Sequence, residues 1–248
     1  IWIGAIRGNA GVLTQGQVVA LYNYMSQILV ELIKLANLII TITKALACAG
    51  RIESVFQVQC GMADGDVREG SDDSRIPAVE FKNVSLTYKG SMAPSVDGIS
   101  FKAMKGQTIG IIGGTGSGKS SFVNLIPRLY DATEGEVLVD GVNVKDYYIE
   151  ALRDKVGIVM QKAVLFTGTI RENMRMGNKT ATDEQIDEAL AISQSKEFVD
   201  SKEGRLDYQI EQGGKNLSGG QRQRLTIARA IVKKPDVLIL DDSASALD

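Results

Sequence analysis

The stretch "GIIGGTGSGKSS" carries the residues whose types and spacing point most directly to a chemistry. Its core reads Gly113-x-x-x-x-Gly118-Lys119-Ser120, the spacing of a phosphate-binding P-loop. Glycines let the backbone curl so that its N–H groups point at phosphates, and a following helix adds partial positive charge. We expect Lys119 to reach the β- and γ-phosphates of a nucleotide and Ser120 to coordinate Mg²⁺. The residues expected to bind the nucleotide here are Gly113, Gly114, Thr115, Gly116, Ser117, Gly118, Lys119, Ser120 and Ser121.

Two adjacent carboxylates, Asp241 and Asp242, follow the apolar run "VLIL" near the end of the sequence. A P-loop enzyme needs a carboxylate at the end of a neighbouring strand to help hold Mg²⁺. Four apolar residues predict a strand that buries its body and presents Asp241 at its tip. The residues alone leave it open whether Asp242 is a catalytic base or only a charge at a strand end.

A second glycine-rich helix start lies in "NLSGGQRQRLTIARAI". Ser218 is a good N-cap residue, and apolar residues recur on one face of the helix that should follow. Glycine costs up to ~1 kcal/mol inside a helix relative to alanine, so Gly219 and Gly220 suggest close approach to a ligand. One nucleotide does not need two such sites from one chain. Head-to-tail pairing would let this helix start cover the γ-phosphate held by another chain, whereas the alternative is an ordinary capped helix.

Composition excludes several other chemistries. The 248 residues contain no histidine, which excludes Ser-His-Asp and Cys-His catalysis and histidine-ligated metals within this chain. Two cysteines, Cys48 and Cys60, are too few for a disulfide framework or a zinc site. A net charge of -2 and a pI near 5.4 give no indication of a nucleic-acid partner.

The elements that must position these residues form an α/β domain. Strand-like runs alternate with helical patterns from about residue 77 onward, which is typical of a largely parallel core sheet. A buried strand is expected over 109–112, just before the P-loop, and a helix over 120–130 after it. The strand-like runs are residues 78–88, 107–113, 136–141, 155–161 and 236–241.

The first 57 residues differ in composition. Residues 18–50 contain no proline and predict one long helix. Glu31 and Lys34 interrupt its apolar run but can pair on one face, so hydropathy leaves a membrane span and a soluble bundle helix both open. Residues 58–76, rich in Gly, Asp and Ser, read as an exposed linker.

"LSGGQ", placed after a P-loop and before a strand ending in aspartate, resembles the signature of ABC ATPases. The resemblance implies an ABC nucleotide-binding domain over 77–248, with a RecA-like parallel core, an antiparallel β subdomain and an α-helical subdomain. It implies that Tyr88 stacks on adenine and that Gln161 touches Mg²⁺ and the attacking water. ATP and Mg²⁺ are the implied cofactors. The implied metal ligands are Ser120, Gln161 and Asp241, and the residues implied to act in trans are Ser218, Gly219, Gly220 and Gln221.

"LFTGTIREN" and "EQGGKNLSGGQ" are similar to the exporter subgroup of that family. Residues 1–57 resemble the last membrane helix of its transmembrane domain, which implies a multi-pass protein of the cell membrane with a cytoplasmic nucleotide-binding domain. The implied partner is a second ABC half-transporter, and the chain is expected to be a fragment truncated at both ends. "SALD", residues 245–248, matches the family's D-loop.

In most of this family the residue after the strand-end aspartate is glutamate, the general base, whereas here it is Asp242. Aspartate is shorter by one methylene, roughly 1.5 Å, and a misplacement of about 1 Å can cost ~10²-fold in rate. The resemblance therefore implies a weakly hydrolytic site in one subunit of a heterodimer, and a fragment that is inactive alone. The alternatives are a homodimeric exporter with an active aspartate base and, less in keeping with the first helix, a soluble ABC ATPase acting on nucleic acid or in assembly.

Overall fold

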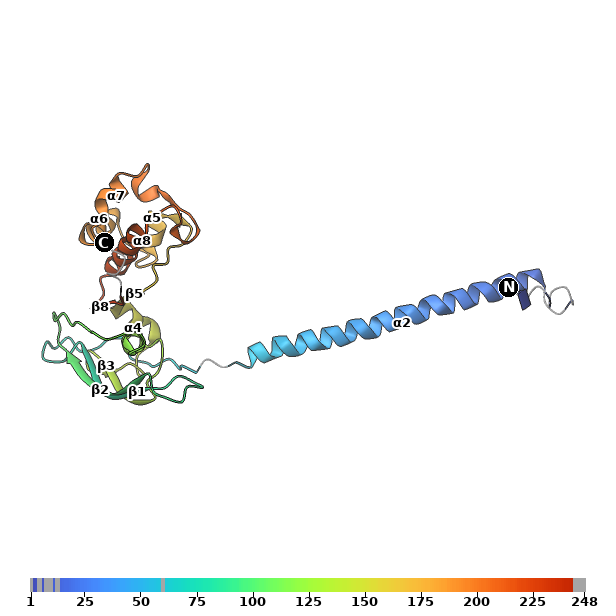
Figure 1. Ribbon diagram of the computed structural model, residues 1–248, viewed down its shortest axis with the longest axis horizontal. Helices are drawn as coiled ribbons and strands as arrows, with labels where there is room; N and C mark the ends of the chain where they lie inside the picture. The colour runs from blue at the N-terminus through green and yellow to red at the C-terminus, as the bar shows by residue number, and fades with distance from the viewer. Residues whose placement is uncertain (1, 4–5, 7–10, 12–13, 59–60, 243–248) are drawn as a thin grey trace. The chain divides into compact units, whose positions relative to one another are not determined.

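The computed structural model of the chain describes residues 2–3, 6, 11, 14–58 and 61–242 (Figure 1). The chain divides into two compact units, Ile1–Gly61 and Met62–Asp248. "SALD" and Cys60 lie outside the described residues.

The long helix of the first unit, α2, runs without interruption over Gln15–Phe56 (Figure 1). Thr14 caps it: its backbone N–H donates to the Gln17 side chain at 2.9 Å, and its hydroxyl accepts from the Gln17 N–H. The predicted pair forms, with Lys34 Nζ 2.8 Å from a Glu31 carboxylate oxygen. The helix predicted over 18–50 is therefore confirmed, and a local capping motif fixes where it begins.

No side chain of α2 is buried within this unit. Over its most apolar 18 residues the mean hydropathy is 1.7, so by length and composition the helix can cross a membrane. The hydroxyls of Thr41 and Thr43 donate to main-chain carbonyls four residues earlier, each at 2.8 Å. These polar groups are satisfied inside the helix, as an apolar surrounding requires.

The second unit begins with an antiparallel sheet in the order β2-β1-β3-β4. A buried cluster, which includes Phe81, Phe122, Tyr147 and Leu152, packs this sheet against α3 and α4. The strand expected within 78–88 is β1, and that expected within 136–141 is β3. The bounds are Val79–Leu86 for β1, Val96–Ala103 for β2, Glu134–Val139 for β3, Val142–Asn143 for β4, Lys119–Asn124 for α3 and Ile149–Lys155 for α4.

A parallel pair of strands supplies the core of the α/β part. Strand β5, Val156–Val159, pairs with β8, Val237–Leu240, in the register Val159↔Leu240. Both match predicted runs. Only Ile239 of β8 is fully buried, while Leu238 and Leu240 are 43% and 52% exposed. The expectation that β8 buries its whole body is therefore met on one face only.

The predicted strand over 109–112 is wrong. Residues 107–114 adopt no regular secondary structure, and Ile112 is 99% exposed. An apolar run forms a strand only when a neighbouring strand accepts and donates its main-chain hydrogen bonds. Among the described residues, none of the strands pairs with this run.

A helical part packs around a second buried cluster, which includes Ile170, Met174, Leu190 and Leu225. Capping boxes at Thr169, Thr182 and Ser218 start three of its helices, each with Glu or Gln three residues later. The bounds are Ile170–Arg175 for α5, Asp183–Ile192 for α6, Lys196–Asp200 for α7, Gly219–Val232 for α8, Gly168–Thr169 for β6 and Gln209–Ile210 for β7, with short 3₁₀ turns at Arg205–Asp207 and Gln212–Gly214.

Part of the segment expected to be an exposed linker is packed within the second unit. Val67 forms a parallel bridge with Tyr147, and the Ser71 N–H donates to the Asp140 carbonyl at 3.0 Å. A Cβ on Gly65 would lie 2.1 Å from the carbonyl oxygen of Asp146. Composition alone suggested that glycine here makes the segment flexible. In the structure, glycine at this position allows the two backbones to approach closely.

Candidate functional site

The P-loop runs from the end of residues 107–114 into α3. Lys119 turns back over the loop, and its Nζ donates to the carbonyls of Gly113 and Gly114 at 2.7 and 2.8 Å. Gly118 has a φ of +86°, and a Cβ there would lie 2.2 Å from the Ser95 carbonyl oxygen. Glycine is required at 118 for both reasons, since other residues rarely adopt this backbone and would collide with the chain entering β2.

Helix α3 begins at Lys119 and buries Phe122 and Val123, which leaves Ser120 exposed at its start. The helix ends at Asn124, although the pattern predicted helix to residue 130. Pro127 explains the early end, because it has no N–H to donate and disfavours helical geometry in the residue before it. Residues 125–130 continue as turns.

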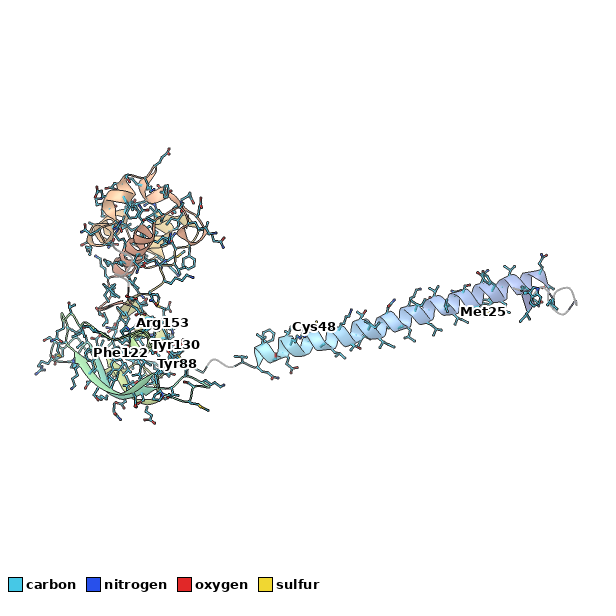
Figure 2. All side chains as sticks on the ribbon, viewed as in Figure 1. Met25, Cys48, Tyr88, Phe122, Tyr130 and Arg153 are labelled. Carbon is cyan, nitrogen blue, oxygen red and sulfur yellow. The ribbon has the colours of Figure 1, made fainter. Side chains whose placement is uncertain are left out.

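Tyr88 follows β1 and reaches α3. Its hydroxyl donates to the Ser121 Oγ at 3.0 Å, and its ring meets the Tyr130 ring edge to face, with centroids 4.9 Å apart. Both tyrosines are labelled in Figure 2. The predicted adenine-stacking residue and a predicted P-loop residue are thus in contact. Sequence reasoning missed Tyr130, although an aromatic residue at the end of the expected helix was a visible signal.

The two carboxylates lie where β8 ends. The Asp241 N–H donates to the Val159 carbonyl at 2.9 Å, which extends the β5–β8 ladder by one step. The Asp242 carboxylate accepts from the Gln161 side-chain amide at 3.1 Å. Because parallel strands end at the same edge, residues 161 and 242 meet although 81 positions separate them in the sequence. The structure therefore brings together the predicted glutamine and the predicted base.

Asn173, which sequence reasoning also missed, fixes the loop that follows Gln161. It is fully buried on α5, and its amide donates to the carbonyls of Phe166 and Thr169 at 2.9 and 3.0 Å. Its side-chain oxygen accepts from the Phe166 N–H at 2.9 Å. Arg229 adds a bond from its guanidinium to the Val164 carbonyl at 3.0 Å, and burial lowers the pKa of this guanidinium.

Ser218 caps α8 as predicted, and Gln221 completes the capping box. The Ser218 N–H donates to the Gln221 side chain at 3.0 Å, and the Ser218 hydroxyl accepts from the Gln221 N–H at 3.2 Å. A Cβ on Gly219 would meet nothing within 4 Å among the described residues. Within the described residues, no hydrogen bond or ion pair joins residues 218–221 to the P-loop, and none joins the Asp241 carboxylate to it.

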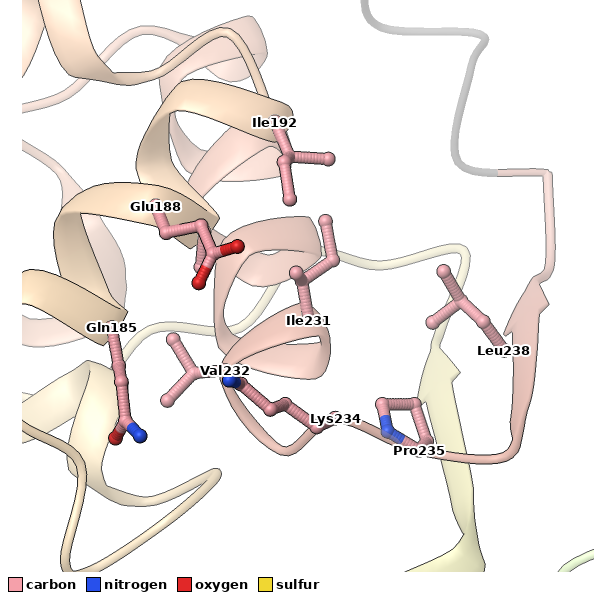
Figure 3. A pocket seen from close by; sticks show the side chains of 9 residues that line it. Gln185, Glu188, Ile192, Ile231, Val232, Lys234, Pro235 and Leu238 are labelled. Atoms are coloured by element: carbon pink, nitrogen blue, oxygen red, sulfur yellow. The ribbon is translucent and has the colours of Figure 1, made fainter.

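Two hollows adjoin these elements. The first, of about 600 Å³, lies beside the P-loop between Gly118, Lys119 and β2 residues such as Val96 and Phe101. The second, of about 490 Å³, lies between α6, α8 and β8 (Figure 3) and contains none of the predicted site residues. The hollow beside the P-loop is the one that borders the predicted nucleotide-binding residues.

The donor set fits Mg²⁺. The metal prefers oxygen ligands, keeps several waters and is usually bound by one or two protein oxygens together with substrate phosphates. The hydroxyl of Ser120 is exposed at the start of α3, and the half-buried Asp241 is held by the β5–β8 ladder. Gln161 offers a third oxygen, because its amide nitrogen is the atom that contacts Asp242.

Comparison with known proteins gives consistent matches. The ABC transporter family model matches residues 96–245. An uncharacterized ABC transporter ATP-binding protein of Mycobacterium tuberculosis is 38% identical over 251 residues, which is 100% of this chain and 43% of that protein. The putative multidrug export ATP-binding/permease protein YgaD of Bacillus subtilis is 38% identical over 238 residues, covering 96% of this chain and 41% of that protein.

Among solved structures, the chain resembles a bacterial Atm1-family ABC exporter with ATP bound. The TM-score is 0.77 at 31% identity, over 96% of this chain and 41% of that one. The chain thus spans less than half the length of these relatives. Because the family model covers more than half of the chain, and the same residues carry the P-loop, the glycine-started helix and the strand-end carboxylate, the chain belongs to the ABC transporter family.

Proposed function

We propose that this chain is the ATP-binding part of an ABC exporter subunit, and that it couples ATP binding and hydrolysis to export across the cell membrane. The observation that carries the proposal is the contact between Gln161 and Asp242 at the shared edge of β5 and β8. This contact places an amide and a carboxylate beside Asp241, in a chain that also carries a complete P-loop.

In this proposal the P-loop backbone and Lys119 hold the phosphates of ATP, and Tyr88 stacks on adenine. Lys119 would exchange its present bonds to two loop carbonyls for bonds to phosphate oxygens, which are charged and therefore stronger acceptors. Ser120, Gln161 and Asp241 would hold Mg²⁺, which when bound neutralises charge on the phosphates. Asp242 would accept the proton of the attacking water, held in orientation by Gln161.

The partner in this proposal is a second ABC half-transporter. Residues 218–221 would close the nucleotide site of that partner. The free space at Gly219 supports this role, because nothing among the described residues explains a glycine there. A heterodimer in which the site with Asp242 hydrolyses slowly fits the shortened base, while a homodimer with a working aspartate is the second candidate.

The proposed domain arrangement assigns 1–57 to the last membrane helix, 58–76 to a connection and 77–248 to a cytoplasmic nucleotide-binding domain. The exposed apolar surface of α2 supports the membrane assignment. The same surface argues against a soluble ABC ATPase acting on nucleic acid or in assembly. A membrane-insertion assay on residues 1–57 separates the two: failure to insert would favour the soluble protein.

The central test measures MgATP binding and turnover by the full-length protein in lipid nanodiscs. Lys119→Ala should strongly reduce affinity, because the loop loses its only side-chain cation. Lys179→Ala is the matched control, since Lys179 is exposed and has no ion pair among those described. Equal affinity in Lys119→Ala and the wild type would refute the assignment of the P-loop.

A further inference from the structure

Tyr88 is held at two separate points on its side chain. Its hydroxyl donates to Ser121 Oγ at 3.0 Å, and its ring packs edge to face with the Tyr130 ring at 85° between planes. Edge-to-face pairs with centroids near 5 Å are attractive beyond the area that they bury. Two contacts of different kinds restrict both torsions of the Tyr88 side chain.

Both contacts come from one continuous segment, α3 and the turns that follow it. Tyr130 is 44% exposed, yet residues close to it in the sequence make ion-pair and hydrogen-bond contacts within the unit. Arg128 is buried and pairs with Asp131 at 2.7 Å. Thr133 accepts the Thr87 N–H at 3.1 Å through its hydroxyl, and that hydroxyl donates to Ser85.

The main chain next to Tyr88 is therefore bonded to the main-chain segment that contains Tyr130. Thr87 precedes Tyr88 directly and is bonded to Thr133, three residues after Tyr130. The position of the Tyr88 ring is consequently fixed relative to the segment that begins with Lys119 and Ser120. A ring placed in this way keeps a constant distance from the phosphate-binding loop.

We propose that Tyr130 is a positioning residue for the base of the nucleotide: it braces the Tyr88 ring against α3 so that adenine and phosphates are bound at a fixed separation. This inference rests on the proposed function, in which Tyr88 stacks on adenine. Tyr130 acts through Tyr88. Without the brace the Tyr88 ring gains rotational freedom, and ATP must order it on binding, which weakens affinity.

The test compares two probes, MgATP and the Mg²⁺ complex of inorganic tripolyphosphate, by calorimetry on the full-length protein in nanodiscs. Tripolyphosphate has the phosphates but no base, so only ATP can sense the Tyr88 ring. Tyr130→Ala should raise the Kd for MgATP roughly three- to tenfold, the range expected for loss of an aromatic pair, and leave tripolyphosphate unchanged. Tyr130→Phe keeps the ring and should restore wild-type affinity.

Two further variants make the test specific. Tyr148→Ala removes another half-exposed ring of the same unit, one that contacts Arg68 and not Tyr88, and should change neither affinity. Tyr88→Phe removes only the hydroxyl contact, so its effect should be small alone and larger when combined with Tyr130→Ala. Such non-additivity is expected when two contacts hold one group.

The outcomes separate the inference from the proposed function. If Lys119→Ala weakens both probes while Tyr130→Ala changes neither, the brace is refuted and the nucleotide site stands. If Tyr130→Ala weakens both probes equally, the residue has only a general structural role and the inference is refuted. If Lys119→Ala leaves both probes unchanged, the proposed function fails.

Discussion

The side-chain amide of Gln161 lies 3.1 Å from a carboxylate oxygen of Asp242, and the two residues are carried by the ends of β5 and β8. The contact depends on the parallel pairing of those strands, since both must end at the same edge. Asp242 has a φ of +47°, a region that aspartate tolerates better than most residues. The position of the proposed base therefore depends on one long-range pairing and on one unusual backbone angle.

Lengthening the proposed base should speed hydrolysis if its reach is what limits the reaction. In Asp242→Glu we expect the ATPase rate of this site to rise, by up to ~10²-fold if the remaining groups are in place. Asp242→Asn keeps the size of the side chain but cannot accept a proton. If the site hydrolyses slowly, as proposed, this change should lower the rate only slightly. Steady-state ATPase of the reconstituted full-length complex, with Lys119→Ala as the inactive reference, measures both changes.

Lys155 connects the antiparallel sheet to the parallel pair of strands. Its Nζ lies 2.9 Å from Asp140 and 3.2 Å from Asp236. Removing the charge in Lys155→Met leaves the buried Asp140 with Lys105 alone, at 3.6 Å. We expect a loss of about 2 kcal/mol and a melting temperature lower by roughly 4–8 °C. Lys102→Met, which removes an exposed partner of Glu80, is the control and should change stability by less than ~1 kcal/mol.

The same lysine should make stability depend on pH in the alkaline range. Burial lowers the pKa of Lys155, but hydrogen bonds to Asp140 and Asp236 and the charges of both outweigh burial and raise it. The folded state therefore holds this proton more tightly than the unfolded chain. Its contribution is complete below the ordinary lysine pKa of about 10.4 and declines as pH rises from there toward the raised value. Between pH 9 and about 11.5, melting temperature should fall more steeply in the wild type than in Lys155→Met; parallel curves would contradict this assignment.

Asn173 should be difficult to replace, because three main-chain groups depend on its amide. In Asn173→Leu, the Phe166 N–H and carbonyl lose their partners inside the protein, which costs about 1–3 kcal/mol for each group left unsatisfied. We expect lower thermal stability and faster amide hydrogen exchange at Phe166 in the full-length protein. Asn178→Leu, another asparagine near the same helix but less buried, is the control. Unchanged exchange at Phe166 would show that the side-chain clasp is dispensable.

Much of this architecture could be predicted because its signals are local. The capping residue Ser218, the long helix α2 and the P-loop spacing are all encoded within a few positions of where they act. The meeting of Gln161 and Asp242 could be anticipated only through the family resemblance, because nothing in their local sequence specifies which strands pair.

The failures come from interactions that are distant in sequence. Strand β2 was missed because Asp97 and Gly98 weaken its pattern, yet it pairs with β1 across two irregularities in register. The run over 109–112 is largely apolar, like β8, but has no pairing strand among the described residues. The packing of Gly65 and Gly70 against residues 140–147 was likewise invisible, since glycine signals a flexible linker and a close approach equally well.

Gly219 should be required by the partner's nucleotide site and not by the fold of its own chain. A Cβ at position 219 meets nothing in the described part of this chain, and alanine favours helices. Gly219→Ala should therefore leave the free energy of unfolding unchanged or raise it by up to ~1 kcal/mol. The melting temperature should not fall. If the helix start faces the partner's γ-phosphate, the same methyl group should nevertheless reduce ATPase activity of the complex. Such a loss of activity without loss of stability is expected only when the space that the methyl group fills is needed by a ligand outside this chain.

Charge at this position separates the heterodimer from the homodimer. Gly219→Asp would place a carboxylate against the partner's phosphate in a desolvated cleft and should nearly abolish ATPase activity, whereas Gly219→Asn, of equal size and no charge, should cost less. In a heterodimer Gly219→Asp disables the fast site. It should therefore be far more damaging than Asp242→Asn, which affects only the slow site. If the two variants are equally damaging, Asp242 is a working base and the complex behaves as a homodimer. If Gly219→Asp is harmless, α8 does not face a phosphate, and the assignment of residues 218–221 to the partner's site is refuted.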